Sequence, residues 1–234
     1  MQNAIIAPMD ARKAAIIADV RGSRKIKDFV ALRDRKLAWA SSKHLSLGLI
    51  QAPYAVTVWD EFQTLAGRTR DIPRILFDLH RLFQPLSLWL GIGIGEVTGL
   101  TDATDGRSLS DVAGGEAFLL ARDSIDEVKD RRTKYLRLTA FKSAQPARDE
   151  LLGQLYGLHD TLLLQVTPAQ WRTIDACIEA GQQDDAAEKL GLSASTVSRN
   201  LRRAHYWQMM EVQDSATRLL TQIPQPMQQA GQTV

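Results

Sequence analysis

The chain has 234 residues, 44% of them apolar and 24% charged, which is ordinary for a globular protein of one medium and one small domain. A formal net charge of +2 does not by itself indicate nucleic-acid binding, and a single cysteine excludes a disulfide framework. The longest apolar stretch, residues 86–94, is too short for a membrane span and residues 1–13 lack a signal-peptide pattern, so we expect a cytoplasmic protein that binds no membrane.

The first two thirds of the chain show strand and helix patterns in a regular order. Runs that are apolar on both faces predict buried strands, and apolar residues three and four apart predict helices. The order describes an α+β sandwich with helices on a mostly antiparallel sheet. The predicted elements are a strand over residues 14–20, a helix over 27–47, a hairpin of strands over 54–59 and 62–65, a helix over 72–83, a strand over 86–97, a helix over 115–129, a strand over 135–141 and a helix over 148–165.

Three details of these elements bear on the core and on possible sites. Gly91, Gly93 and Gly95 lie on one face of their strand, where a helix or a ligand can approach the backbone closely. Residues 101–115 predict a polar loop, whose Asp102, Asp105 and Asp111 are better explained as solvated turn residues than as metal ligands. The core positions expected in the first helix include Phe29, Val30, Leu37 and Leu45.

Residues 182–207 have the spacing of a DNA-binding helix-turn-helix. The first helix ends at Gly191, where a positive φ lets the chain reverse, and Leu192 is expected to fill the angle between the helices. Val197 and Leu201, at i and i+4, are expected to face the first helix. The small and apolar residues expected on the first helix are Ala186, Ala187 and Leu190.

A third helix is expected just upstream to support this pair. Thr167 and Gln170 form a capping box with Pro168 at the first helical position. The apolar stripe that follows, including Cys177, predicts a packing role for that cysteine. The apolar residues of this supporting helix are Trp171, Ile174, Cys177 and Ile178.

The remaining face of the second helix is polar and basic. Either Ser193 or Ser195 is expected to cap its start. Arg and Asn side chains can pair with guanine and adenine edges, whereas Ser, Thr and other Arg side chains can hold phosphates. We therefore predict that double-stranded DNA is bound by Ser195, Thr196, Ser198, Arg199, Asn200, Arg202 and Arg203.

The charge distribution supports this prediction locally. From Thr167 onward the chain has six Lys and Arg residues and seven Asp and Glu residues, so this part is not basic overall. Its positive charge is concentrated on the second helix, and a local stripe matters more for docking than net charge. Two alternatives stay open, namely a helical hairpin with a solvated basic face and a surface that binds a protein.

Several motifs resemble known families. Residues 191–204, GLSASTVSRNLRRA, resemble the helix-turn-helix of LuxR-type regulators and of sigma-factor region four. Residues 18–23, ADVRGS, resemble the opening motif of class III nucleotide cyclases, and residues 60–62, DEF, resemble the hairpin motif that these cyclases share with GGDEF domains. Residues 91–97, GIGIGEV, and 115–122, GEAFLLAR, are similar to the next strand and helix of the cyclases.

The order of these motifs, with the terminal helix-turn-helix, makes the chain look most like the SatD family. This resemblance implies an α+β fold, with a ferredoxin-like or cyclase-like palm sandwich followed by a small all-α helix-turn-helix domain. The expected parts are a palm domain over residues 1–145, a connecting helix over 146–166, a helix-turn-helix domain over 167–222 and a disordered tail over 223–234.

The cyclase resemblance also implies a ligand. In the cyclases two aspartates on adjacent strands bind two divalent ions that hold a triphosphate, and those positions are Asp19 and Asp60 here. The expected ligand is thus Mg²⁺ or Mn²⁺ with a nucleotide. Asp19 and Asp60 would be the metal ligands, and the nucleotide would contact Arg21, Gly22, Ser23, Glu61 and Gly93.

The chain departs from the cyclase pattern at two places that matter for catalysis. The transition-state Asn and Arg of the cyclases would fall on Leu119 and Asp123, and the two glycines of GGDEF domains are Val58 and Trp59. These departures argue against cyclisation or dinucleotide synthesis, and we expect no catalytic residue.

Asp19 and Asp60 therefore have three open interpretations. They hold a metal and a nucleotide in a sensor, they are structural with Asp19 paired to Arg21 or Arg24 and Asp60 capping a turn, or they retain some catalysis. We expect a DNA-binding transcriptional regulator with a degenerate sensor domain that forms a homodimer through the first domain. The alternative is a nucleotide cyclase or nucleotidyltransferase with an accessory helix-turn-helix.

Overall fold

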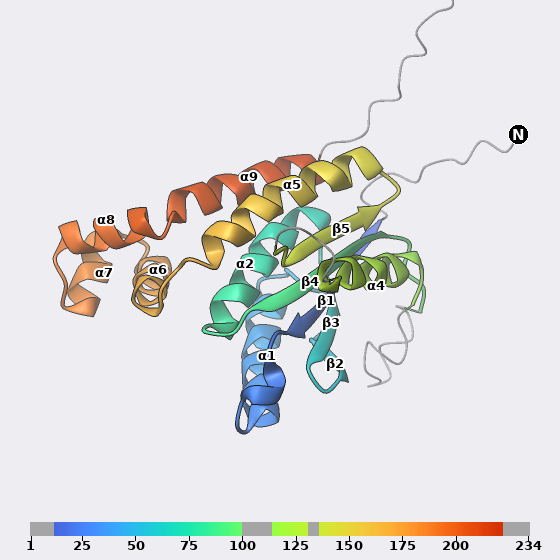
Figure 1. Ribbon diagram of the computed structural model, residues 1–234, viewed down its shortest axis with the longest axis horizontal. Helices are drawn as coiled ribbons and strands as arrows, with labels where there is room; N and C mark the ends of the chain where they lie inside the picture. The colour runs from blue at the N-terminus through green and yellow to red at the C-terminus, as the bar shows by residue number, and fades with distance from the viewer. Residues whose placement is uncertain (1–11, 100–113, 131–135, 222–234) are drawn as a thin grey trace, which may run out of the picture.

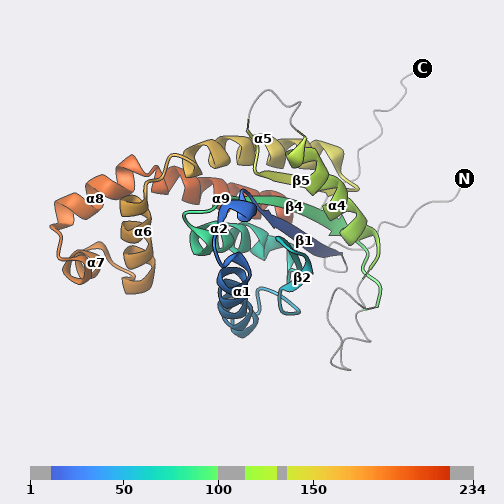
Figure 2. The same ribbon diagram turned by 60° about the horizontal axis from the view of Figure 1, so that its bottom comes forward.

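A mixed five-stranded sheet with helices on both faces is followed by a C-terminal run of helices (Figure 1 and Figure 2). The computed structural model describes residues 12–99, 114–130 and 136–221. The strand order is β2-β3-β1-β4-β5, in which only the β4–β5 pair is parallel. The α+β class and the predicted order of strands and helices are thus confirmed. The strands are β1 (Lys13–Val20), β2 (Ala55–Val58), β3 (Glu61–Leu65), β4 (Leu88–Gly95) and β5 (Thr139–Ser143).

β1 is the central strand and is buried on both faces, as its apolar run predicts. Ile16 and Ala18 belong to the larger core cluster under four helices, whereas Ala15 and Ile17 belong to a second cluster on the opposite face. The helices of the larger cluster are α1 (Phe29–Ser46), α2 (Ile72–Phe83), α5 (Pro146–Leu163) and α9 (Tyr206–Thr221), and the short 3-10 turns η2 (Ser23–Lys25) and η3 (Thr69–Asp71) precede α1 and α2.

The opposite face is covered by α4 (Glu116–Lys129), which lies directly on the glycine-rich strand β4. A Cβ atom at Gly91 or Gly93 would collide with the backbone of α4, around Ala117 and Ala121. The prediction of a close approach to this face is confirmed, and the approaching element is a helix. Because α4 fills the space over Gly93, no room is left for the nucleotide contact expected there.

Two of the core positions expected in α1 are wrong. Val30 is 41% exposed and Leu45 is 39% exposed, whereas Phe29 and Leu37 are buried. The buried face of α1 instead includes Arg33, whose guanidinium donates to the carbonyl of Trp59 and to the carboxylate of its neighbour Asp34. The buried face of α1 therefore differs from the face predicted by apolar spacing, because it includes a hydrogen-bonded arginine in place of Val30 and Leu45.

The C-terminal helices extend away from the sheet and then return to it. α6 (Pro168–Ala180), α7 (Gln183–Leu190) and α8 (Ala194–Arg203) lie beyond one end of the sheet, and α9 runs back alongside α5 in the opposite direction (Figure 1 and Figure 2). Ala216 and Leu220 of α9 are fully buried in the same core cluster as Ile16. α9 is therefore packed on the sheet part, which the sequence does not predict.

Other sequence predictions fall on residues outside this description. The aspartates of the polar loop, at positions 102, 105 and 111, and the tail over residues 223–234 lie outside the described residues. Among the helices that are described, none combines the length and the apolar character needed to cross a membrane.

The return of α9 gives a prediction about stability. Replacing Leu220 by Ala should lower the free energy of unfolding by about 2–5 kcal/mol, because the side chain is completely buried and a cavity remains. Leu158→Ala on α5 is the matched control, since Leu158 is 69% exposed and its loss should have little effect. Urea unfolding followed by circular dichroism measures both, and equal stabilities for the two variants would contradict the docking of α9.

Candidate functional site

α6, α7 and α8 are built by the local signals expected from the sequence. Thr167 Oγ1 accepts a hydrogen bond from the Gln170 amide at 3.3 Å, and Gln170 Oε1 accepts one from the Thr167 amide at 2.8 Å. The capping box that starts α6 is thus confirmed. Gly191 ends α7 in the left-handed region at φ 63°, and Ser193 Oγ accepts from the Thr196 amide at 3.2 Å to start α8.

The inward-facing residues hold α8 firmly against its neighbours. Ala186, Ala187, Val197 and Leu201 are buried as predicted, and the last three share a core cluster with Trp171 of α6. Leu192 is the exception, because it is 40% exposed and does not fill the angle between the helices. The Ser193 cap and the Gly191 turn set that angle without it.

The opposite face of α8 presents a basic surface. Ser195, Arg199, Arg202 and Arg203 are exposed, and Thr196 and Ser198 are partly exposed. None of these three arginines takes part in an ion pair within the described part of the chain. α8 lies at the end of the molecule remote from the sheet, so that nothing described in the chain covers this face (Figure 1).

Asn200 is placed differently from the DNA contact expected for it. Its Nδ2 donates to Thr173 Oγ1 of α6 at 3.1 Å, and the residue is only partly exposed. Asn200 lies one residue before the buried Leu201, on the flank of α8 that faces α6. Its amide therefore holds the two helices together in this structure.

A second cluster of charged residues lies where β1 ends and β3 begins, beneath α4. Asp19 and Glu61 are partners in the β1–β3 register, so their side chains lie on the same face of the sheet. Lys129 Nζ of α4 is 2.7 Å from Asp19 Oδ2 and 3.7 Å from Glu61 Oε2. Arg122 of α4 donates two hydrogen bonds of 2.6 Å to the two carboxylate oxygens of Glu61. The structural interpretation of Asp19 is closest to this arrangement, but its partner is Lys129 and not Arg21 or Arg24.

The other residues expected to hold a nucleotide surround this cluster. Ser23 Oγ donates to Asp60 Oδ2 at 2.6 Å, which ties η2 to the turn between β2 and β3. Gly22 has a left-handed φ of 73° with open space around it. The Arg21 guanidinium lies over the ring of Trp89, 5.2 Å from its centre, and within the described residues it forms no ion pair with Asp19. The structure thus gathers Asp19, Asp60, Glu61 and Ser23 at one end of the sheet, as the motifs predict.

The two carboxylates that face α4 have opposite pKa shifts. Burial raises the pKa of Asp19, and the negative charges of Asp60 and Glu61 add to this effect while Lys129 opposes it. Burial also acts to raise the pKa of Glu61, but hydrogen bonds from Arg122 and Thr57 outweigh it and hold that pKa below its usual value. Glu61 is therefore the well-stabilised carboxylate of the cluster, and Asp19 is the poorly stabilised one.

As they stand, these residues do not fit a two-metal site. Both oxygens of Glu61 and one oxygen each of Asp19 and Asp60 accept hydrogen bonds from protein donors. Within the described residues, no group of three or more His, Cys, Asp or Glu side chains is arranged to hold a metal ion. Binding of a metal ion and a nucleotide by these residues stays a prediction. Such binding would require Lys129 to release the Asp19 carboxylate.

Sequence reasoning did not identify Arg122 and Lys129 as members of this cluster. They follow Glu61 and Asp19 by 61 and 110 residues, so no local spacing links them. The signal that could have found them is their separation on α4, because residues seven apart lie on the same face of a helix. The sheet-facing side of α4 carries Ala121 and Ile125, next to both cations.

The comparisons with known proteins identify one family. The sequence matches the SatD family over residues 13–220. The crystal structure of a regulator of polyketide synthase expression from Bifidobacterium adolescentis is similar at 15% identity, covering 89% of this chain and 79% of that chain, with a TM-score of 0.28. A TM-score this low does not establish a common fold, so nothing about this chain follows from that regulator. No curated protein matches the sequence.

The charged cluster gives a prediction about two neighbouring carboxylates. Glu61→Gln should lower the free energy of unfolding by about 1–3 kcal/mol, because half-exposed Arg122 loses a paired, buried partner. Asp19→Asn should leave the free energy of unfolding unchanged or slightly higher, because burial disfavours the charged form of Asp19. The pKa of Glu61 is lower in the folded protein than in the unfolded chain. The contribution of Glu61 to the free energy of unfolding is therefore present above about pH 4.5 and is lost as the pH falls further. Urea unfolding from pH 7 to pH 3 measures both effects.

Asp19→Asn, together with Asp60→Asn, also tests the metal prediction. If Mg²⁺ or Mn²⁺ with ATP raises the melting temperature, and both Asp19→Asn and Asp60→Asn remove that rise, the metal displaces Lys129 and the sensor interpretation is right. A melting temperature that is indifferent to metal and nucleotide supports the structural interpretation, in which α4 supplies the cations.

Proposed function

We propose that this chain, which belongs to the SatD family, is a DNA-binding transcriptional regulator whose α7–α8 pair is a helix-turn-helix. The observation that carries the proposal is the division of α8 into two faces. Val197 and Leu201 are buried against α6 and α7, whereas Arg199, Arg202 and Arg203 project from the remote end of the molecule. A recognition helix in the major groove needs side chains that bond base edges and phosphates. The three arginines on the exposed face of α8 can supply such contacts.

In this proposal the sheet part is a degenerate, cyclase-like palm that regulates and does not catalyse. What supports it is the surface of α4, where a cyclase needs polar groups that orient ribose and neutralise phosphate. Leu119 is 71% exposed there and Asp123 is exposed and acidic, so neither can stabilise developing negative charge. The cation of α4 nearest these positions, Arg122, is committed to Glu61.

The proposal predicts that the arginines of α8 determine affinity for DNA. Changing Arg199, Arg202 and Arg203 together to Ala should weaken binding by about 100-fold or more, because each contact to a base or phosphate contributes about 1–3 kcal/mol. The remaining affinity should also depend less steeply on salt, since fewer counterions are released. Fluorescence anisotropy with DNA selected from a random genomic pool measures both quantities.

A charge-matched control separates specific docking from net charge. Arg24, Lys25 and Lys27 are also exposed, but they lie beside the sheet, so changing all three to Ala should leave DNA affinity nearly unchanged. Equal losses in the two triple variants would indicate non-specific attraction. Wild-type protein that retains no DNA at low salt but captures RNA polymerase in a pull-down would instead favour the protein-binding alternative.

We also propose a homodimer, because paired half-sites are the usual way in which a helix-turn-helix reaches specificity. What supports it is the free edge of the sheet. β2 is an edge strand on which Val56 and Val58 are 39% and 60% exposed, and Trp59 at the hairpin tip is 43% exposed. An exposed apolar edge strand is a surface on which a second copy can continue the sheet.

A charge placed on this edge should therefore separate the two copies. Val58→Lys should shift the protein from dimer to monomer in light scattering, because each copy would place a like charge on the shared edge strand. Val30→Lys, at an exposed apolar position on α1, is the matched control and should stay dimeric. A wild-type protein that is already monomeric at micromolar concentration would contradict this assembly.

A further inference from the structure

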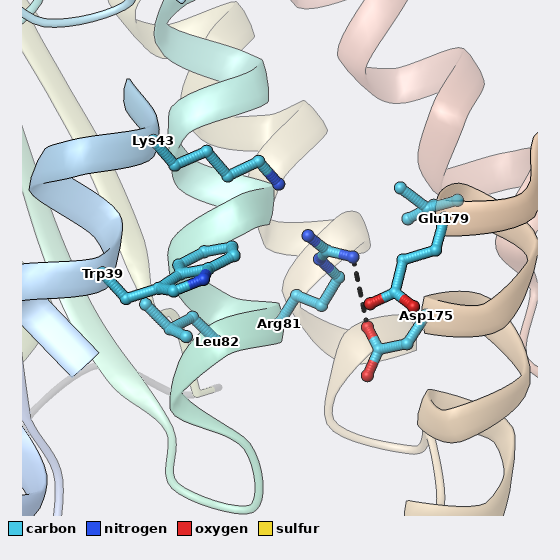
Figure 3. Close-up of a pocket in the computed structure, with 7 residues that line it drawn as sticks. Trp39, Lys43, Arg81, Leu82, Asp175 and Glu179 are labelled. Carbon is cyan, nitrogen blue, oxygen red and sulfur yellow. Dashed lines mark hydrogen bonds and ion pairs between the residues drawn. The ribbon is translucent and has the colours of Figure 1, made fainter. Parts of the chain in front are cut away.

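A groove lies between the sheet part and the C-terminal helices. It has a volume of about 350 Å³, within the range of small-molecule sites, and its walls come from α1, α2 and α6 (Figure 3). Neither the cyclase-like motifs nor α8 contribute to it. The residues that line the groove are Trp39, Lys43, Arg81, Leu82, Asp175, Ile178 and Glu179.

The α1 wall offers an aromatic face and a cation. Trp39 is 47% exposed, so part of its indole ring is open to solvent in the groove. Lys43 Nζ lies 4.7 Å from the centre of the Trp39 ring. Among the residues that the structure describes, no carboxylate forms an ion pair with the Lys43 ammonium, so the cation can turn to an incoming anion.

The α2 wall offers a second cation, which is already desolvated. The Arg81 side chain is 9% exposed and is held by Asp78 at 3.4 Å beneath it and by Asp175 at 3.3 Å across the groove. Figure 3 shows the Lys43 ammonium and the Arg81 guanidinium extending toward the same space. Two cations that converge beside an exposed indole ring form a site for a planar molecule with one anionic group.

The α6 wall carries the weaker partner of Arg81. Burial raises the pKa of Asp175, and the negative charge of Glu179 adds to this effect while Arg81 opposes it. The Asp175 side chain is also 43% exposed, so its carboxylate can turn to water when it leaves Arg81. A carboxylate or phosphate of a ligand can replace it on Arg81 at a small cost, because Arg81 keeps its contact to Asp78.

We propose that this groove binds a small planar anion, whose carboxylate or phosphate group is held by Lys43 and Arg81. Its ring stacks on Trp39 once the Lys43 ammonium, which lies over the indole ring, has turned to the anionic group. The apolar side chains of Leu82 and Ile178 line the rest of the groove. A neutral molecule of the same shape can stack on the ring but cannot make the two charge-assisted hydrogen bonds, so the site selects for the anion.

The position of the groove gives the ligand a route to α8. α6 forms one wall, and α6 also holds α8 through the Thr173–Asn200 hydrogen bond and through the shared core around Trp171. An anion that takes Arg81 from Asp175 removes an ion pair between the sheet part and α6. Ligand binding should thus change the orientation or freedom of α8, and this regulatory step rests on the proposed DNA binding.

Two matched pairs of probes test the site without any DNA. Salicylate and salicylamide compare a carboxylate with its neutral amide, and AMP and adenosine compare a phosphate with no phosphate. Chemical-shift titration of ¹⁵N-labelled full-length protein, including the indole resonance of Trp39, should show binding of at least one anion and about tenfold weaker binding of its neutral partner.

Variants of the groove locate the binding. Lys43→Gln should weaken the anion by about tenfold and leave the neutral probe unchanged, and Trp39→Ala should weaken both. Arg35→Gln is the matched control, because Arg35 is an exposed cation of the same helix that does not line the groove. The proposal is overturned if no anion binds, if neutral and anionic probes bind equally, or if Arg35→Gln has the same effect as Lys43→Gln.

A final arm separates this proposal from the proposed function. The bound anion should change DNA affinity in wild-type protein by several-fold and should not do so in Lys43→Gln. Protein that binds the anion in the groove but shows no DNA binding keeps the site and refutes the proposed function. Protein whose DNA affinity is identical with and without saturating anion refutes the regulatory step.

Discussion

The arrangement of this molecule depends on one apolar junction between the sheet part and the C-terminal helices. Phe77 of α2 and Trp171 of α6 lie with their ring centres 6.0 Å apart, and they share a core cluster with Leu163 at the end of α5 and Leu201 of α8. Burial of these side chains removes apolar surface of both parts from water at once. α8 is therefore held in a fixed position relative to the sheet by buried apolar contacts, and not only by the chain that connects the two parts.

Much of the fold could be predicted because its signals are local. The capping box at Thr167, the left-handed turn at Gly191 and the doubly apolar run of β1 each need only a few neighbouring residues, and each is present in the structure. The glycines of β4 predicted a close approach without saying what approaches. A glycine shows that something can approach the backbone at its position. The element that approaches here, α4, lies elsewhere in the sequence and cannot be identified from the glycines alone.

What could not be predicted depends on which faces meet in three dimensions. Apolar spacing could not show that α1 buries Arg33 and exposes Val30, because a buried arginine is acceptable only with the hydrogen bonds that tertiary packing supplies. The pairing of Lys129 with Asp19 and the Asn200 hydrogen bond to α6 have the same origin. Residue types indicated the chemistry of each side chain, but the partner was decided by packing.

The return of α9 also has a consequence for the order in which the chain folds during synthesis. Leu220 completes the core cluster that contains Ile16, although about two hundred residues separate them. A nascent chain can form the strand order of the sheet early, yet the surface of α2 and η3 that α9 covers stays open to water until α9 leaves the ribosome. The arginine-bearing α8 is thus synthesised before the core beneath α9 is closed, and a chain interrupted between α8 and α9 exposes an apolar strip that chaperones can recognise.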